Sequence, residues 1–369
     1  DIEGMARRER VSHRFYVPWR FLALVNCFPL AEVSFNRQFR CMKRHRYFSL
    51  GLWVIMLVAL VAGVACRTTR RAENAPLSSA ERAALLKRGK SPQVFGLTTY
   101  NSDRGAVIAG AFRMHKGHAA RVDFRSDSAT TTPVVGVNDN QWLMLLDSTA
   151  SESWITVDAL DGMKGLLLAQ PDPIETQPRH VYDPVGGLAA LVPKMTIDKM
   201  HIESSVFYMR NEYGPLGPLT RWEKSPFLDG VLGADFLRAF QFVRVSLRGR
   251  FVVFSATAPY PAASQAMATM SLVDEQGALA VEGRIDGEPK TILIDLAGDF
   301  ELAMDRPEHP VARQISLGDV VFRQVEVESA VDLGLGVGGA PRIGRQLLER
   351  YDLVFNRKGS ELLLERPSR

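Results

Sequence analysis

From residue 94 onward, short apolar runs alternate along the chain with clusters of Gly, Asp, Asn and Pro. Apolar runs of about four to eight residues between such clusters are typical of β-strands joined by tight turns. Helical periodicity is brief and occurs chiefly at 236–240 and 345–351. This pattern predicts a mainly β fold with short helices.

One order of elements occurs twice in this region. An apolar run ends in Asp147 in the first copy and in Asp295 in the second, and each Asp is followed by a turn of small residues and a further strand. An apolar segment with a glycine, Gly233 or Gly344, then leads into a short helix and two more strands. Such a repeat indicates two lobes with the same architecture.

Each copy also contains an alternating hairpin. The first is predicted to pair 195–202 with 204–208, and the second to pair 315–322 with 325–327. Alternation with a period of two places apolar side chains on one face of a sheet.

At these residues the chain resembles the pepsin and retropepsin superfamily of aspartic proteases. Each lobe of that family joins an apolar-apolar-Asp-Thr/Ser-Gly loop to a later apolar-apolar-Gly segment and a short helix. The resemblance implies a mainly β fold of two tandem retropepsin-like β-barrel lobes with short helices, at 93–262 and 263–369. It also implies that Asp147 and Asp295 hydrolyse peptide bonds as an acid–base pair acting on a water molecule, with Ser148 as an orienting neighbour and without a metal or cofactor.

The two Asp turns depart from the family pattern. The sequence reads Asp147-Ser148-Thr149 in the first copy and Asp295-Leu296-Ala297 in the second, so both glycines are absent. A side chain in place of glycine strains a loop where φ is positive. A register shifted by one residue would instead place a small residue, Ala150 or Gly298, at the required position. The Ser148 hydroxyl group can bond across the lobe interface, whereas Leu296 offers no donor.

Three interpretations of the two acids remain open at this stage. In the first, the protein is an aspartic endopeptidase acting on polypeptides. In the second, it is a catalytically inactive relative that binds peptide or has a structural role in the cell envelope. In the third, the lobes are a generic β-barrel repeat, in which Asp147 and Asp295 are ordinary turn acids. For the aspartic-protease interpretations, the hairpin flap over the cleft is expected between 154 and 170, with its tip at 160–165.

The N-terminal part of the chain has the pattern of an export signal. From Met42, a short cationic stretch precedes an apolar run and small residues that end at Cys66. The end of 42–66 resembles a bacterial lipoprotein signal, which implies lipid modification of Cys66. The alternative is an uncleaved membrane anchor, since the run is nearly as long as the ~17 residues that a spanning helix needs. Both interpretations predict a membrane-tethered protein of the periplasm or of the outer-membrane-facing cell envelope.

Two flanking segments complete the predicted organisation. Residues 1–41 are interpreted as upstream sequence included by mis-annotation. Residues 67–92 are polar and charged, and are expected to be a tether with a short helix over 80–86 that Ser78 or Ser79 caps.

Charge and residue usage narrow the function classes. The formal net charge is +4, but many of the basic residues lie in the first ninety positions, and no Lys/Arg stripe with interleaved aromatic residues follows. Nucleic-acid binding is therefore not expected. All three cysteines lie at or before Cys66, and the seven histidines form no His-Glu-x-x-His motif, so neither a metal site nor a thiol nucleophile is predicted in the lobes.

Overall fold

The computed structural model describes residues 75–76, 78–102, 105–109, 113–114, 119–125, 132–169, 184–210, 212–213, 228–261, 266–335, 339–356 and 358–367. The segments 1–41 and 42–66, with Cys66, lie outside the described residues, and their roles stay predictions. Among the helices that the structure describes, none has both the length and the apolar composition needed to cross a bilayer.

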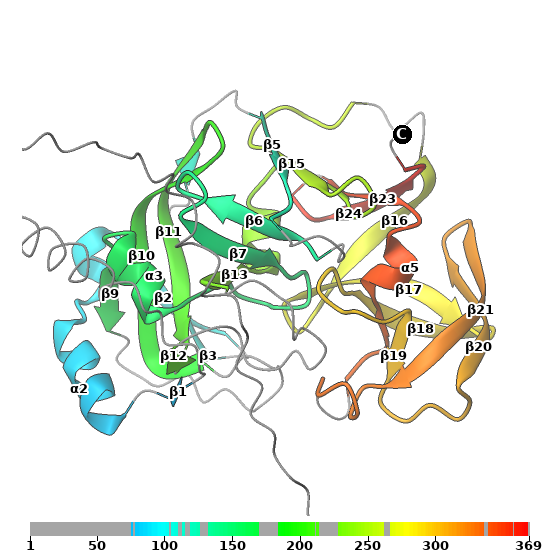
Figure 1. Cartoon of the computed structure of the whole chain (residues 1–369), viewed down its shortest axis with the longest axis horizontal. Coiled ribbons are helices and arrows are strands. Elements are labelled where there is room, and N and C mark those ends of the chain that lie inside the picture. The colour runs from blue at the N-terminus through cyan, green and yellow to red at the C-terminus, as the bar shows by residue number, and fades with distance from the viewer. Residues whose placement is uncertain are drawn as a thin grey trace, which may run out of the picture. The chain divides into compact units, whose positions relative to one another are not determined.

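The first lobe is built on a sheet that brings distant strands side by side (Figure 1). Its order is β6, β7, β13, β8, β11, β10, β9, and β4 also pairs with β11. The two strands that matter most for the site, β7 and β13, run parallel to each other. The strands are β4 (Arg113–Met114), β6 (Val134–Val137), β7 (Trp142–Leu146), β8 (Trp154–Ile155), β9 (Leu166–Ala169), β10 (Pro184–Ile197), β11 (Met200–Arg210) and β13 (Gly230–Leu232).

The second lobe contains a closed ring of strands. The order is β18, β22, β19, β21, β20, β17, and β18 also pairs with β17, which closes the ring into a barrel. Closure leaves no free sheet edge within the ring. The strands are β17 (Ala278–Ile285), β18 (Glu288–Ile294), β19 (Leu302–Met304), β20 (Val311–Leu317), β21 (Val320–Ser329) and β22 (Arg342–Ile343).

Strand pairing around the two Asp residues is the same in both lobes. The parallel pair β7–β13 places Leu146 opposite Leu232, and the parallel pair β18–β22 places Ile294 opposite Ile343. In each lobe the following short strand, β8 or β19, runs antiparallel to one of these strands and parallel to the hairpin strand β11 or β21. The predicted mainly β fold of two repeated lobes is confirmed.

The sheet of the second lobe continues beyond the barrel, because β16 pairs with β17, and this extension contains strands from both halves of the chain. The order of the extension is β16, β24, β23, β14, β15, β5. The antiparallel pair β14–β23 joins the halves directly, and Arg244 on β14 donates a hydrogen bond of 2.7 Å to Asp352 on β23. The lobes are thus held together by backbone pairing. The strands are β5 (Ala119–Asp123), β14 (Phe242–Ser246), β15 (Phe251–Ser255), β16 (Ala266–Glu275), β23 (Asp352–Asn356) and β24 (Glu361–Glu365).

Burial along the strands follows their place in the sheets. The residues of β5 alternate between exposed and buried, as expected of a strand with one solvent-facing side, whereas β6 and β13 are buried throughout. The short helices α4 (Ala234–Arg238) and α5 (Arg345–Leu348) follow Gly233 and Gly344 and bury their apolar side chains. The sequence predicted both helices in these places.

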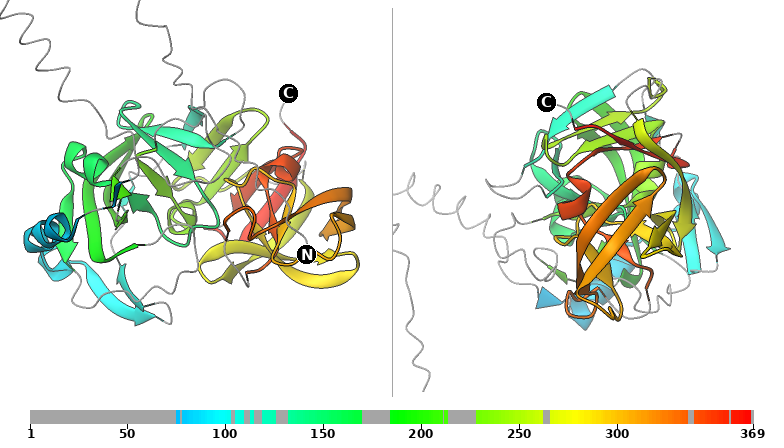
Figure 2. Two further views of the ribbon diagram at one scale, coloured as in Figure 1. Left: turned by 60° about the horizontal axis from the view of Figure 1, so that its bottom comes forward. Right: turned by 90° about the vertical axis from the view of Figure 1, so that its right-hand side faces the viewer.

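The predicted turns of the two hairpins are wrong by several residues. The β10–β11 hairpin turns at Asp198 and Lys199, and the β20–β21 hairpin, orange in Figure 2, turns at Gly318 and Asp319. Asp198 has φ 51° and Gly318 has φ 53°, as tight two-residue turns require. The positions taken for turns lie inside long continuous strands.

The segment before the first lobe also folds onto it. Helix α2 (Ser79–Arg88) begins after Ser78, whose hydroxyl group and backbone form a capping box with Glu81. Leu85 of this helix is buried in the core, and Lys90 bridges to Leu168 of β9. The predicted short helix is therefore present. Other short elements are β1 (Ala75–Pro76), which pairs with β12 (Glu212–Tyr213), the 3-10 helix η1 (Pro92–Phe95), and β2 (Thr98–Ser102), which pairs with β3 (Gly105–Ala109).

The predicted flap tip at 160–165 is wrong. Thr156 caps the helix α3 (Val157–Gly162), whose side chains Ala159 and Leu160 are buried in the core. Strand β9 follows and pairs with β10. The residues that connect β9 to β10 lie outside the described part of the chain.

Candidate active site

Asp147 lies directly after β7 and is held by the neighbouring parallel strand. Its backbone amide donates to the carbonyl oxygen of Leu232 at 3.1 Å. The chain then turns back, so that the amides of Thr149 and Ala150 donate to Asp147 Oδ1 at 2.8 and 3.3 Å. The hydroxyl group of Thr149 donates to the same oxygen at 2.7 Å. Only 2% of the Asp147 surface is exposed.

Asp295 occupies the equivalent place after β18. Its amide donates to the carbonyl oxygen of Ile343 at 2.9 Å. The amides of Ala297 and Gly298 donate to Asp295 Oδ1 at 3.0 and 2.7 Å. Asp295 is 3% exposed. The two turns therefore present their carboxyl groups in the same way, although neither contains the glycine of the family motif.

The strain considered for the altered turns does not arise. Neither Thr149 nor Ala297 is among the described residues with positive φ, so a side chain is compatible with the backbone at both positions. The residue after each carries the small side chain: Ala150 in the first turn and Gly298 in the second. A Cβ on Gly298 would lie 2.3 Å from the ring of Phe300, so this glycine is required for packing.

Two further glycines bring a second segment against each turn. A Cβ on Gly233 would lie 2.6 Å from the carbonyl oxygen of Glu152, and one on Gly344 would lie 2.3 Å from that of Phe300. The amide of the next residue then donates to the Asp turn: Ala234 to Ala150 at 2.7 Å, and Arg345 to Gly298 at 2.9 Å. This close backbone approach holds both Asp turns in place.

Ser148 connects the two turns across the lobe boundary. Its hydroxyl group donates to the carbonyl oxygen of Ile294 and accepts from the amide of Leu296 at 3.3 Å. The amide of Leu279 donates to the carbonyl oxygen of Ser148 at 2.9 Å. Leu296, at the equivalent place in the second turn, is fully buried and has no hydroxyl group to return the bond. The brace is one-sided, as the sequence suggested.

The two carboxyl groups interact electrostatically. Burial, followed by the charge of Asp147, raises the pKa of Asp295 to about 6, against the opposing effect of Arg342 and of the two turn amides. Two carboxyl groups that influence each other in this way titrate as a pair. A buried carboxyl group with a raised pKa beside a second buried acid is an arrangement suited to acid–base chemistry near weakly acidic pH.

Two arginines make the second lobe different from the first. Arg342 Nη1 lies 3.8 Å from Asp295 Oδ2, and Arg345 pairs with Asp299 at 2.9 Å. Both arginines are buried, with 7% and 4% of their surface exposed. The matching residues of the first lobe are Val231 and Ala234, because β13 and β22 pair in the same register. Desolvation by burial lowers the pKa of Arg345 from its usual value.

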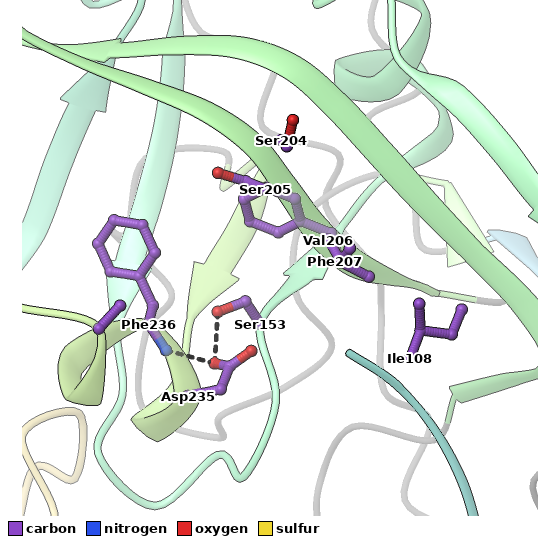
Figure 3. A pocket seen from close by; sticks show the side chains of 9 residues that line it. Ile108, Ser153, Ser204, Ser205, Val206, Phe207, Asp235 and Phe236 are labelled. Carbon is purple, nitrogen blue, oxygen red and sulfur yellow. Dashed lines mark hydrogen bonds between the residues drawn. The ribbon is translucent and has the colours of Figure 1, made fainter. Parts of the chain in front are cut away.

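A separate cavity of about 160 Å³ lies beside α4 (Figure 3). Ser153 and the Phe236 amide both donate to Asp235 Oδ1 at 2.7 Å. The surrounding protein desolvates the Asp235 carboxyl group and raises its pKa to about 6, although part of the side chain is exposed along the cavity. Neither Asp147 nor Asp295 lines this cavity, so it is distinct from the paired acids.

The three predicted site residues of the lobes therefore lie together: Asp147, Ser148 and Asp295. Three neighbours were not predicted: Thr149 as a donor to Asp147, and the two buried arginines. The sequence signal for Arg342 was a charged residue at a place where the first copy has the apolar Val231. Within the described ranges, no three His, Cys, Asp or Glu side chains gather so as to hold a metal ion.

No family model and no curated protein matches the sequence. Among solved structures, the aspartic proteinase from Irpex lacteus is 14% identical with a TM-score of 0.41, over 68% of this chain and 98% of that chain. Conglutin gamma, a basic 7S globulin from lupine seeds, is 11% identical with a TM-score of 0.39, over 68% of this chain and 95% of that chain. The two-lobed fold described above rests on the strand pairing of this chain itself.

Proposed function

We propose that this protein is an aspartic endopeptidase that hydrolyses polypeptides with Asp147 and Asp295. The observation that carries the proposal is the placement of the two buried acids in equivalent turns, with the charge of Asp147 contributing to the raised pKa of Asp295. Because the pKa of Asp295 is raised to about 6, its carboxyl group holds a proton at weakly acidic pH. One acid then accepts a proton from water while the other donates to the scissile carbonyl group.

The proposed cellular setting comes from the sequence. The cationic and apolar segment 42–66 supports export and tethering at the membrane, through lipid on Cys66 or through an uncleaved helix. A protein in the periplasm or facing the outer membrane would meet unfolded or extended polypeptides there. Polypeptide is accordingly the proposed substrate.

A catalytically inactive, peptide-binding role is the second candidate. Leu296 removes one of the two hydroxyl groups that brace the turns, and Arg342 lies beside Asp295. An arginine near Asp295 favours the ionised form of that acid, which removes the proton that the carbonyl oxygen would need. This candidate predicts binding of extended peptides without cleavage.

Incubation with unfolded protein distinguishes the two candidates. The full-length chain is mixed with a denatured protein mixture from pH 3 to 7, and new peptides are measured by mass spectrometry. Asp147→Asn and Asp295→Asn should each abolish cleavage. Asp286→Asn, in an exposed turn where Asp286 Oδ1 accepts the Gln314 amide, is the matched control and should retain it. Folded protein that cleaves at no pH would refute the endopeptidase proposal, and peptide binding by that protein would support the second candidate.

A further inference from the structure

The hydrogen bonds to the two acids differ in number. Asp147 Oδ1 accepts three bonds, of which the shortest, 2.7 Å, comes from the Thr149 hydroxyl group. Asp295 Oδ1 accepts two bonds, both from backbone amides. The residue matching Thr149 in the second turn is Ala297, which has no hydroxyl group. The asymmetry therefore lies in one side chain.

Hydrogen bonds from donors favour the ionised form of a carboxyl group, because that form only accepts. Thr149 and the turn amides are buried together with Asp147, where water competes little for the same oxygen. The additional hydroxyl donor consequently favours negative charge on Asp147 over negative charge on Asp295.

The charged groups around the pair also need to be considered. Arg342 on β22 faces Asp295 Oδ2 at 3.8 Å, a charge contact longer than a hydrogen bond. Arg345 on α5 acts mainly on Asp299, with which it pairs at 2.9 Å. The net effect of burial, Asp147 and Arg342 still raises the pKa of Asp295 to about 6. Arg342 therefore opposes the effect of burial on Asp295 but does not cancel it.

We infer that Thr149 is a positioning residue that keeps Asp147 as the ionised member of the pair and leaves the shared proton on Asp295. This inference rests on the proposed hydrolysis. Thr149 stands where the resembled family has glycine, so its hydroxyl group is a feature of this chain. The family motif assigns no role to a side chain at that position.

Each acid then has a fixed role in the reaction. Asp147 accepts a proton from water as the water oxygen bonds to the peptide carbon, and Asp295 donates its proton to the carbonyl oxygen. When the tetrahedral intermediate collapses, the C–N bond breaks, Asp147 passes its proton to the amine, and Asp295 recovers one from the geminal hydroxyl group. The pair returns to its starting protonation state without a net change in electrons.

The test compares pH profiles of peptide hydrolysis by the full-length chain, Thr149→Val and Thr149→Ser. Valine has nearly the same shape as threonine and keeps both backbone amide donors to Asp147, but it lacks the hydroxyl group. Thr149→Val should move the acidic limb of the profile to higher pH by about one unit, with the alkaline limb unchanged, since a bond to a charged group favours it by about this amount. Thr149→Ser should restore the wild-type profile. An unchanged acidic limb, or a shift of the alkaline limb instead, would overturn the inference.

A second readout separates this inference from the proposed function. Carboxyl carbon NMR on the full-length chain with labelled Asp follows both titrations without needing turnover. If the wild-type protein cleaves nothing, the endopeptidase proposal fails, yet Thr149→Val should still raise the lower of the two titration midpoints of the pair. Thermal unfolding verifies that each variant is folded, and Thr149→Ala, which copies Ala297, replaces the valine variant if that one is not. Midpoints that do not change in the folded variant would refute the role of Thr149.

Discussion

The hydroxyl group of Ser148 donates a hydrogen bond to the carbonyl oxygen of Ile294, on the other side of the lobe boundary. The Ser148 hydroxyl oxygen also accepts a hydrogen bond from the amide of Leu296 at 3.3 Å, so one side chain satisfies two backbone groups of the opposite turn. All of these groups are buried. The second turn makes no such bond in return, because its matching residue is Leu296.

Ser148→Ala should lower the free energy of unfolding by about 1–3 kcal/mol, because it leaves a buried carbonyl and a buried amide of the second lobe without this partner. Chemical denaturation of the full-length chain measures the change. Ser148→Thr keeps the hydroxyl group and is the matched control, for which a much smaller loss is expected. Equal stability of the alanine variant and the wild type would show that the brace contributes nothing.

Arg342→Val copies Val231 of the first lobe into the second. Since Arg342 lowers the pKa of Asp295, its removal should raise that pKa above about 6. A charge about 4 Å away in a partly buried site is strong enough to move a titration by one pH unit or more. Carboxyl carbon NMR measures the shift directly, and the alkaline limb of any hydrolysis profile should move up with it.

The control for this variant is Arg350→Gln. Arg350 also pairs with an acid, Glu301, at 2.8 Å, but half of its side chain is exposed and it does not contact Asp295. Its removal should leave the titration of Asp295 unchanged. A fall in the pKa of Asp295 after Arg342→Val would contradict the assigned effect of the arginine.

The strands and the repeat could be predicted from the sequence because the alternation of apolar residues indicates burial directly. The positions of the hairpin turns could not be predicted in the same way. Ser204 has φ 60° and Gln324 has φ 53°, so each long strand contains a local irregularity near which the alternation is interrupted. In the sequence, these interruptions resemble turns in both copies alike. The true turns at 198–199 and 318–319 carry residues tolerant of positive φ, which was the better signal.

The site was only partly predictable for a related reason. Asp147, Ser148 and Asp295 follow from their place in the repeat, and the structure puts them together, although their catalytic role stays a prediction. The setting of Arg342 depends on the position of β22 between β18 and β19, which no local pattern gives. The flap was misplaced because Thr156 caps a helix over the residues 157–162, which were expected from the sequence to lie in a hairpin.

The raised pKa of Asp295 predicts a stability that falls as pH rises. Because the folded-state pKa of about 6 exceeds the unfolded value of about 3.9, the native state binds more protons between these pH values. The contribution of this group is therefore fully present below about pH 4 and is lost as pH rises through about 6. Asp295→Asn removes the effect, so it should be more stable than wild type at pH 7.5 by up to about 3 kcal/mol.

Urea denaturation at pH 4 and pH 7.5 measures this difference. The advantage of Asp295→Asn should be small at pH 4, where the wild-type carboxyl group is protonated. Asp286→Asn, in its exposed turn, should show no such dependence on pH. If Asp295→Asn is less stable than wild type at pH 7.5 and equal to it at pH 4, the charge of Asp295 stabilises the fold and the assigned direction is wrong.

Gly344→Ala should be among the most damaging single substitutions in the second lobe. The added Cβ would meet the carbonyl oxygen of Phe300 at 2.3 Å and that of Gly298 at 2.9 Å, and both contacts are with backbone that already forms the Asp295 turn. Overpacking of this kind typically costs about 1–3 kcal/mol or more, because the surrounding backbone has to move. Displacement of the turn should also weaken the amide bonds to Asp295 and so raise its pKa further. Gly339→Ala has open space around its Cβ and is the control, expected to leave both stability and titration unchanged. A Gly344→Ala variant as stable as that control would show that the glycine is not required for the two segments to meet.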